Sequence, residues 1–251
     1  MVKKKIGQNF LINQEVVERE INYACPNRDD VILEIGPGTG IITKKLAEKA
    51  KQVIAIEIDT RLVEKLKENL PNNVKLINAD ALKIDLDMLP AFNKIVSNLP
   101  FQISSPITFK LLNYPFTKAI LIYQKDFAER MIAKKGSKKY SRLSVGINYK
   151  THCRILETIP KEFFYPIPKV DSCIVELIPR KKPPFKVIDE KYFFKIVTIL
   201  FSHRRKKIKN ILFDKSKNLK NIGNIDRRVE ELSPKQIGNL CNFLFKIDYK
   251  P

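Results

Sequence analysis

Val31–Gly40, VILEIGPGTG, is the most informative segment of the sequence for the architecture of the chain. An apolar run rich in β-branched residues ends in three closely spaced glycines, and a helical pattern, Ile41–Ala50, follows at once. This order predicts a buried strand, a tight turn and the N-terminus of a helix. Glycine is needed where the backbone takes a positive φ or approaches a ligand without a Cβ in the way. Because the unpaired N–H groups of the helix point to the same place, we expect a small-molecule site there.

The next predicted strand, Gln52–Ile58, carries an acid near its C-terminal end, Glu57. An acid about 20 residues beyond the glycines is where nucleotide-binding folds hold a ribose. The glycines read G-x-G-x-G (Gly36, Gly38, Gly40) and not G-x-G-x-x-G, which counts against a pyrophosphate ligand. E-I-G-x-G-x-G resembles motif I of the S-adenosylmethionine-dependent methyltransferases. The alternative is a glycine turn that merely joins strand to helix.

Strand and helix patterns alternate after this stretch, which predicts a parallel sheet covered on both faces. Gly36, Glu57, Asp80 and Asn98 each lie at or just beyond the C-terminal end of a successive predicted strand. In an open parallel sheet these ends line one crevice, at the point where the strand order reverses. We therefore expect an α/β, Rossmann-like fold of the S-adenosylmethionine-dependent methyltransferase type, with its site at this edge.

The chain changes character near Lys181–Pro184, KKPP, which predicts a linker because paired prolines start neither a helix nor a central strand. We expect a catalytic domain over residues 1–180 and a small helical domain over residues 185–251. One of the short helices expected in the second domain covers Arg204–Phe213. Within the first domain, Lys134–Arg142, KKGSKKYSR, is predicted to be an exposed basic loop.

The net charge is +20, with 47 Lys and Arg against 27 Asp and Glu. From Lys181 to the end, 18 basic residues stand against 7 acidic ones. A surplus of this size is typical of proteins that bind a polyanion. Heat-adapted proteins are also rich in lysine, but their glutamate content rises with it, which is not the case here. The charge therefore favours a nucleic-acid partner.

Several classes of protein are disfavoured by composition. No apolar run approaches the roughly 20 residues of a membrane span, and the start, MVKKKIGQNFL, lacks the apolar segment of a secretory signal. Two histidines and four scattered cysteines without a C-x-x-C argue against a zinc site. We expect a cytoplasmic protein with no membrane segment and no metal.

The most specific short signal is Asn98-Leu99-Pro100-Phe101, NLPF. Such a rigid turn suits a flat heterocycle with an amine: the ring stacks on the base, while the Asn carbonyl and a backbone carbonyl accept the two amine hydrogens. These bonds localise the nitrogen lone pair and direct it at a methyl donor. No strong base is required, so catalysis rests on positioning and electrostatics. The alternative is an ordinary loop entering a helix.

Over nearly its whole length the chain resembles the ribosomal RNA adenine dimethyltransferases, whose motifs it carries in order. These are GQNFL (7–11), EIGPGTG (34–40), IEID with Glu57, NADAL (78–82), NLPF and FYPIPKVDS (164–172). FSHRRKKIKN (201–210) resembles the F-x-x-R-R-K-x-L-x-N segment of the small-subunit branch. Two departures are mild: Asn78 replaces a commoner glycine, and Phe101 stands where tyrosine is often found.

The resemblance implies S-adenosylmethionine as cofactor and assigns residues to it and to the target adenine. The implied cofactor-binding residues are Asn9, Leu11, Gly36, Gly38, Glu57, Asp80 and Asn98. Glu57 would hold the ribose hydroxyls and Asp80 the adenine amine of the cofactor. The implied catalytic residues are Asn98, Leu99, Pro100, Phe101 and Phe164, with Phe101 and Phe164 on the two faces of the target base. A core aromatic beside a proline turn is the alternative for Phe164.

The function that follows from the resemblance is dimethylation of the N6 amine of two adjacent adenosines in a hairpin loop near the 3′ end of small-subunit rRNA, during subunit biogenesis. The protein is expected to act as a monomer on the small subunit or its precursor. The residues expected to contact RNA phosphates are Arg204, Arg205, Lys206, Lys207 and Lys209. Alternatives are a large-subunit methylase of the erythromycin-resistance type, a ribosome-assembly factor, and a nicotinamide-dependent oxidoreductase.

Overall fold

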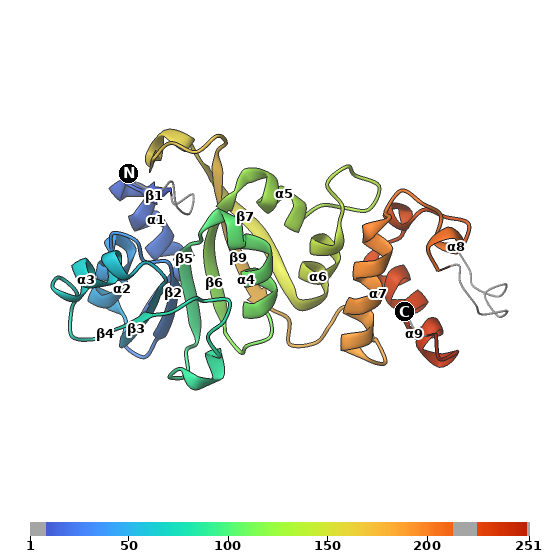
Figure 1. Cartoon of the computed structure of the whole chain (residues 1–251), viewed down its shortest axis with the longest axis horizontal. Helices are drawn as coiled ribbons and strands as arrows, with labels where there is room; N and C mark the ends of the chain where they lie inside the picture. The colour runs from blue at the N-terminus through green and yellow to red at the C-terminus, as the bar shows by residue number, and fades with distance from the viewer. Residues whose placement is uncertain (1–8, 213–224, 250–251) are drawn as a thin grey trace. The chain divides into compact units, whose positions relative to one another are not determined.

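The computed structural model describes residues 9–212 and 225–249 of the 251-residue chain. Two compact units share the chain (Figure 1): Met1–Ala128 with Cys153–Pro179, and Glu129–His152 with Arg180–Pro251. This division differs from the expected domains, because Glu129–His152 belongs to the second unit. The reason is that Tyr140, Val145 and Tyr149 of this segment join the same hydrophobic cluster as the C-terminal helices. Such long-range packing leaves no signal in local composition.

The first unit is built on a seven-stranded sheet with the strand order β4-β3-β2-β5-β6-β9-β7. These strands are β2 (Val31–Ile35), β3 (Gln52–Glu57), β4 (Val74–Asn78), β5 (Lys94–Asn98), β6 (Lys118–Gln124), β7 (Thr151–Ile159) and β9 (Ser172–Pro179). Strands β2 to β6 pair in parallel, and β9 runs antiparallel to β6. The strand order reverses between β2 and β5, so the ligand crevice of such a sheet lies at their C-terminal ends. The predicted α/β, Rossmann-like class is confirmed.

Both faces of this sheet are covered, as Figure 1 shows. On one face, α1 (Gln14–Ala24) and α2 (Ile41–Lys49) pack on side chains that include Ile32 of β2 and Ile120 of β6. Because successive strand residues point to opposite faces, Tyr123 of β6 lies on the face opposite Ile120. The other face is covered in part by α4 (Ser104–Leu111), where the hydroxyls of Thr108 and Tyr123 lie 2.7 Å apart. Other short elements before Phe164 are α3 (Thr60–Lys67), α5 (Lys125–Met131), η1 (Leu86–Met88), η2 (Phe101–Ile103) and η3 (Lys161–Phe163).

A separate two-stranded ribbon joins the N-terminal segment to the FYP segment. Strand β1 (Phe10–Leu11) pairs antiparallel with β8 (Phe164–Tyr165), so that Phe10 is opposite Tyr165 and Leu11 is opposite Phe164. Residues directly opposite each other share a face of the ribbon. Leu11 and Phe164 are buried at 3% and 0% exposure, whereas Tyr165 is 67% exposed. The ribbon therefore has one core face and one open face.

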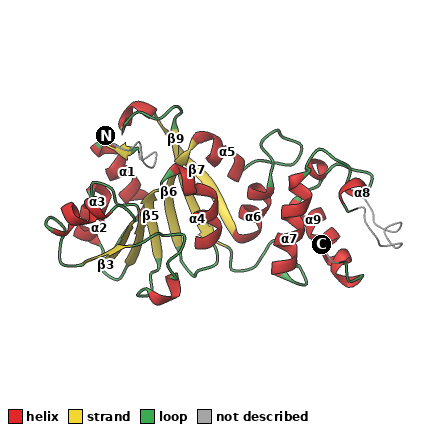
Figure 2. Ribbon diagram, viewed as in Figure 1, coloured by secondary structure: helices red, strands yellow, loops and turns green. Residues whose placement is uncertain are grey.

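The second unit consists mainly of helices (Figure 2). They are α6 (Arg142–Lys150), α7 (Glu190–Ser202), α8 (Ile208–Ile211), η5 (Val229–Glu231) and α9 (Pro234–Lys246). Helix α9 begins at a typical helix-start sequence: Ser233 and Gln236 form a capping box, and Pro234 lies in the first turn. Side chains such as Phe193, Leu200 and Leu240 form the core of this unit.

The helix expected over Arg204–Phe213 is wrong in extent. Of the described residues in this stretch, only Ile208–Ile211 is helical, and Phe213 lies outside the described residues. The backbone before it pairs with a distant segment: Lys207 forms a β-bridge with Arg228, and the Ile208 N–H donates to the Arg227 carbonyl at 2.9 Å. This pairing replaces the helical hydrogen bonds. Among residues 9–212 and 225–249, no helix has the length and apolar character needed to cross a membrane.

Candidate functional site

The glycine turn after β2 packs too closely against its neighbours for any side chain. Gly38 has φ +58°, and a Cβ there would lie 2.9 Å from the ring of Phe10. Gly36 has φ +70°, and its Cβ would lie 3.1 Å from Cγ of Pro100. Positive φ strains every residue with a Cβ, and the close approach adds a steric penalty. Glycine is therefore required at both positions to bring the turn against Phe10 and the NLPF loop.

Glu57, at the end of β3, is tied to this turn. Its side chain is 1% exposed; Oε2 accepts the Gly38 N–H at 3.2 Å, and Oε1 accepts the Asp59 N–H at 3.0 Å. A carboxylate has about four lone-pair sites, so acceptor capacity for two further donors remains. Asn78 Nδ2 donates to the Glu57 carbonyl at 2.9 Å and so holds the neighbouring strand end beside it. The asparagine in place of the commoner glycine thus has a structural role.

Asp80 follows β4 and is partly exposed. Its Oδ1 accepts the Leu82 N–H at 2.9 Å, which orders the turn after the strand. Neither Asp80 nor Glu57 lines the cavity beside Asn98 and Phe101. Glu57 contacts Gly38, and Gly38 lines that cavity.

The last residue of β5, Asn98, has an amide with one end bound and one end open. Its Nδ2 donates to the carbonyl of Asn9 at 3.0 Å. Its Oδ1 is buried and has no hydrogen-bond partner among the described residues. Buried polar atoms in proteins are almost always hydrogen-bonded. An oriented, unsatisfied acceptor at the reversal point of the sheet therefore indicates a ligand with an N–H or O–H donor.

A cavity brings these parts together. It is lined by Asn9, Phe10, Gly36, Gly38, Asn98, Leu99, Pro100 and Phe101. All but Phe10 are among the residues predicted from the sequence. Phe10 was missed, although it lies between two predicted residues, Asn9 and Leu11, of one motif. Gly7 and Gln8 of that motif lie outside the described residues.

The two aromatic residues expected to sandwich a base differ in accessibility. Phe101 lines the cavity, and its ring meets the Phe164 ring edge-on at a centroid distance of 6.5 Å. Phe164 itself is fully buried on the core face of the β1–β8 ribbon, opposite Leu11. In this structure it occupies the position of a core aromatic, and its contact with a base stays a prediction. Leu11 is likewise a buried core residue and is not among the residues that line the cavity.

Two further carboxyls are buried behind the glycine turn. Burial raises the pKa of Glu34 to about 8, and the carboxylate of Glu57 acts in the same direction. Burial also raises the pKa of Glu20, with Glu34 adding to the effect. Among the described residues, Glu34 Oε2 and both carboxyl oxygens of Glu20 have no hydrogen-bond partner. Glu34 is therefore largely protonated in the folded protein near pH 7, and burial favours the protonated form of Glu20 as well.

We expect Glu34→Gln to change the pH dependence of stability. Because the folded-state pKa of about 8 lies above the ordinary value of 4.5, the folded protein binds a proton that the unfolded chain releases. Wild-type stability contributed by this group is thus full below about pH 4.5 and is lost as the pH rises through 8. Glutamine does not titrate, so the difference in Tm between variant and wild type should shift in favour of the variant by about 6 °C or more as the pH rises from 5 to 8. Thermal unfolding across this range tests it; a constant difference in Tm would contradict it.

The five predicted phosphate contacts lie in the second unit and are not equivalent. Arg205, Lys206 and Lys207 are exposed, whereas Lys209 Nζ forms an ion pair with Asp226 at 2.6 Å. Arg204 is turned inward: its Nη1 donates to two backbone carbonyls, and its Nε lies 3.4 Å from a Glu230 carboxylate oxygen. No group of three or more His, Cys, Asp or Glu side chains in the described part of the chain is placed to hold a metal ion.

Comparison with known proteins agrees with this architecture. The profile of the family described as "Ribosomal RNA adenine dimethylase" matches residues 1–246. A Thermococcus onnurineus protein named probable ribosomal RNA small subunit methyltransferase A is 43% identical, over 95% of this chain and 91% of its own length. A Methanococcus maripaludis protein of the same name is 44% identical, over 96% of this chain and 97% of its own.

Two solved structures share the fold across both units. A dimethyladenosine transferase from Plasmodium falciparum has a TM-score of 0.78 at 30% identity, covering 96% of this chain and 98% of its own. The 23S rRNA methyltransferase ErmE has a TM-score of 0.66 at 29% identity, covering 94% of this chain and 98% of its own. Because the family match spans the cavity, the NLPF loop and nearly the whole chain, this chain belongs to the ribosomal RNA adenine dimethylase family.

Proposed function

We propose that this protein dimethylates the N6 amine of two adjacent adenosines in a hairpin loop near the 3′ end of small-subunit rRNA, with S-adenosylmethionine as methyl donor. Membership of the family makes it an rRNA adenine methyltransferase. The small subunit is favoured because the archaeal relatives at 43% and 44% identity carry that name. The segment FSHRRKKIKN (201–210) supports the same branch.

The residues at the cavity fit the cofactor. Gly36 and Gly38 leave the turn free of side chains, and Glu57 keeps unused acceptor sites beside them. We assign the ribose hydroxyls to Glu57, the adenine amine to Asp80, and the remaining contacts to Asn9, Leu11 and Asn98. When bound, S-adenosylmethionine supplies an electrophilic methyl group.

The observation that carries the reaction is the open Oδ1 of Asn98. With Nδ2 held by the Asn9 carbonyl, Oδ1 is oriented to accept one hydrogen of the target amine. A backbone carbonyl of the loop Asn98–Phe101 accepts the other, and Phe101 stacks on the base. These bonds localise the nitrogen lone pair that is otherwise conjugated with the purine ring. Once the methyl group has moved from sulfur to nitrogen, the amine would release its extra proton to water, so positioning and not a strong base supplies the catalysis.

The substrate must present its adenine outside a duplex, because a stacked and paired base cannot enter such a cavity. We propose that the exposed cations Arg205, Lys206 and Lys207 contact phosphates of the small subunit or its precursor. We further propose that the protein acts as a monomer in the cytoplasm.

The test is transfer of labelled methyl groups to purified, unmethylated small and large ribosomal subunits. Dimethyladenosine in small-subunit rRNA is the expected result. Label confined to large-subunit rRNA would assign the protein to the chemistry of the erythromycin-resistance methylases instead. Tight binding to subunits without any label would identify it as an assembly factor and overturn the proposed reaction.

A further inference from the structure

The loop Lys134–Ser141, which we call the lysine loop, presents an uncompensated cluster of positive charge. Lys134, Lys135 and Lys138 are exposed and have no side-chain partner among the described residues. The acids near them are already neutralised: Glu129 forms an ion pair with Lys139, and Glu230 lies beside Arg204. Three lysines within five positions repel one another, so an ordered arrangement requires that the backbone be held.

The backbone of this loop is held by residues distant in sequence. The Gly136 N–H donates to the Glu230 carbonyl at 2.8 Å. Arg204 Nη1 donates to the carbonyl of Lys138 at 2.5 Å and to that of Tyr140 at 3.1 Å. Tyr140 is 1% exposed, and its ring contacts Phe201 edge-on at 5.4 Å. The loop is therefore anchored at its centre and at its end.

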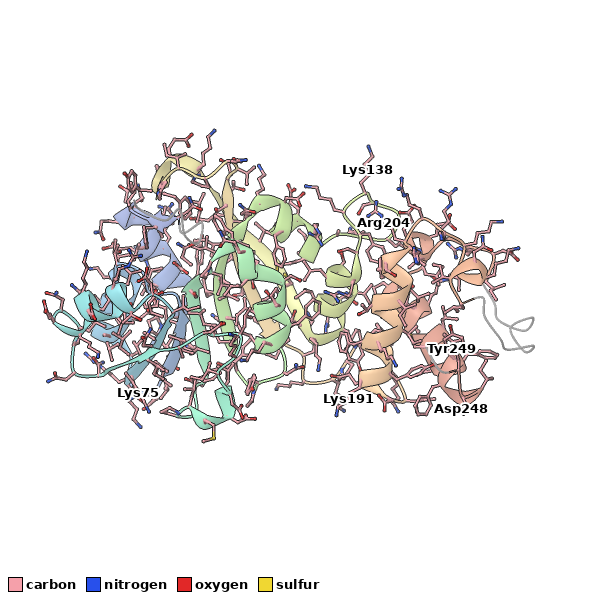
Figure 3. All side chains as sticks on the ribbon, viewed as in Figure 1. Lys75, Lys138, Lys191, Arg204, Asp248 and Tyr249 are labelled. Atoms are coloured by element: carbon pink, nitrogen blue, oxygen red, sulfur yellow. The ribbon has the colours of Figure 1, made fainter. Side chains whose placement is uncertain are left out.

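The guanidinium of Arg204 makes two of the hydrogen bonds that hold the lysine loop. Figure 3 shows Lys138 pointing away from the ribbon while Arg204 lies beneath the same loop. The guanidinium donates to carbonyls of the loop and approaches Glu230 through Nε, so much of its donor capacity is spent inside the protein. The next two residues, Arg205 and Lys206, are exposed. Arg204 thus joins the lysine loop to the basic segment that follows it in sequence.

We propose that Lys134, Lys135 and Lys138 of the lysine loop bind the phosphodiester backbone of the substrate rRNA together with Arg205 and Lys206, and that Arg204 is a positioning residue. Lysine is a point charge on a flexible stem and suits phosphate oxygens without reading sequence. Gly136 and Ser137 between the lysines add no large side chain that would keep the backbone of RNA at a distance. The inference rests on the proposed function, since it names the surface that the rRNA occupies.

The first test is the triple variant Lys134→Gln, Lys135→Gln, Lys138→Gln in the full chain. Its matched control is Lys191→Gln, Lys195→Gln, Lys235→Gln, which removes the same charge from exposed positions on α7 and α9. Binding to purified small subunits is measured from 50 to 200 mM salt. Each lost phosphate contact lowers the slope of log K against log salt by about 0.7–0.9. The loop variant should lose about 2–3 in slope and at least tenfold in affinity, and the control less than twofold.

Equal losses in the two triple variants would show that only net charge matters and would overturn the assignment of the surface. An equal loss of binding to polyglutamate and to rRNA would show a general polyanion surface and would overturn its assignment to RNA. The proposed function is tested separately, by measuring methyl transfer by the wild-type protein. Absence of methylation by the wild type contradicts that function but leaves the salt slopes to decide on the loop.

The role of Arg204 is tested by a double-mutant cycle. Arg204→Lys keeps the charge but offers a single nitrogen in place of Nη1 and Nε, which reach the carbonyls and Glu230 from different positions. It should therefore weaken binding to small subunits at least fivefold in the wild-type background. In the loop variant, whose lysines are already gone, it should add less than twofold. A full additional loss there would show that Arg204 contacts RNA itself or acts through folding, and would overturn the positioning role. Thermal unfolding of each variant separates a folding defect from a binding defect.

Discussion

Replacement of Asn98 by alanine is expected to lower the rate of methyl transfer to the small subunit by about 10²-fold or more. Alanine removes the open Oδ1 acceptor and leaves the carbonyl of Asn9 without the Nδ2 donor at 3.0 Å. The amine hydrogens then lose one of their two acceptors, and the nitrogen lone pair is no longer held in line for attack. Because this contact matters most when charge develops on nitrogen, the loss should fall mainly on kcat.

The measurement is single-turnover methyl transfer with labelled S-adenosylmethionine, with Asn72→Ala as control. Asn72 is an exposed asparagine before β4 and should transfer at the wild-type rate. A hydrogen bond of this kind contributes about 1 kcal/mol to stability, so Asn98→Ala should remain folded. A rate within threefold of wild type, with the fold intact, would remove Asn98 from the reacting centre. Retained binding of subunits by the inactive variant would separate catalysis from any role in assembly.

Replacement of Glu57 by alanine is expected to weaken the binding of S-adenosylmethionine about 10²-fold or more. Two hydrogen bonds from ligand hydroxyls to a charged acceptor contribute about 1.5–3 kcal/mol each, and a factor of ten in Kd corresponds to about 1.4 kcal/mol. The variant also frees the N–H of Gly38, which Oε2 now accepts at 3.2 Å. The turn that lines the cavity therefore loses its internal acceptor as well.

Isothermal titration of S-adenosylmethionine into the two proteins gives the Kd directly. Glu64→Ala serves as the control, because Glu64 is an exposed acid on the neighbouring helix α3 and should bind like wild type. Affinity of Glu57→Ala within threefold of wild type would show that the ribose is held elsewhere. Neither the wild type nor either variant should bind NAD in place of S-adenosylmethionine, because the G-x-G-x-G turn does not suit a pyrophosphate.

Local features of the sequence predicted where the glycine turn and the amide of Asn98 lie. Gly36 and Gly38 were expected at a turn that excludes side chains, and the structure places both at positive φ against Phe10 and Pro100. Asn98 was expected to offer its amide oxygen, and its Oδ1 is the buried acceptor without a partner in the described chain. The turn was predictable because positive φ at glycine depends on residues that are close together in sequence; the roles of these residues stay predictions.

Other features required the three-dimensional arrangement. Phe164 and Tyr165 are neighbours in the FYP segment, yet pairing with Leu11 and Phe10 decides that the first is buried and the second exposed. Motif order alone does not show which face of that ribbon meets the core. The sequence also predicted a helix over Arg204–Phe213, whereas long-range backbone pairing limits the described helix there to Ile208–Ile211.

The α/β class, the glycine turn, the NLPF loop and the family could be predicted from the sequence, because each depends on contiguous residues or on their order. Tertiary structure alone decided that Glu129–His152 belongs to the second unit and that Arg204 holds a loop 66 residues away at Lys138. The physical reason is that burial and hydrogen-bond partners are set by whichever segments the fold brings together. Composition at either position carries no record of the other.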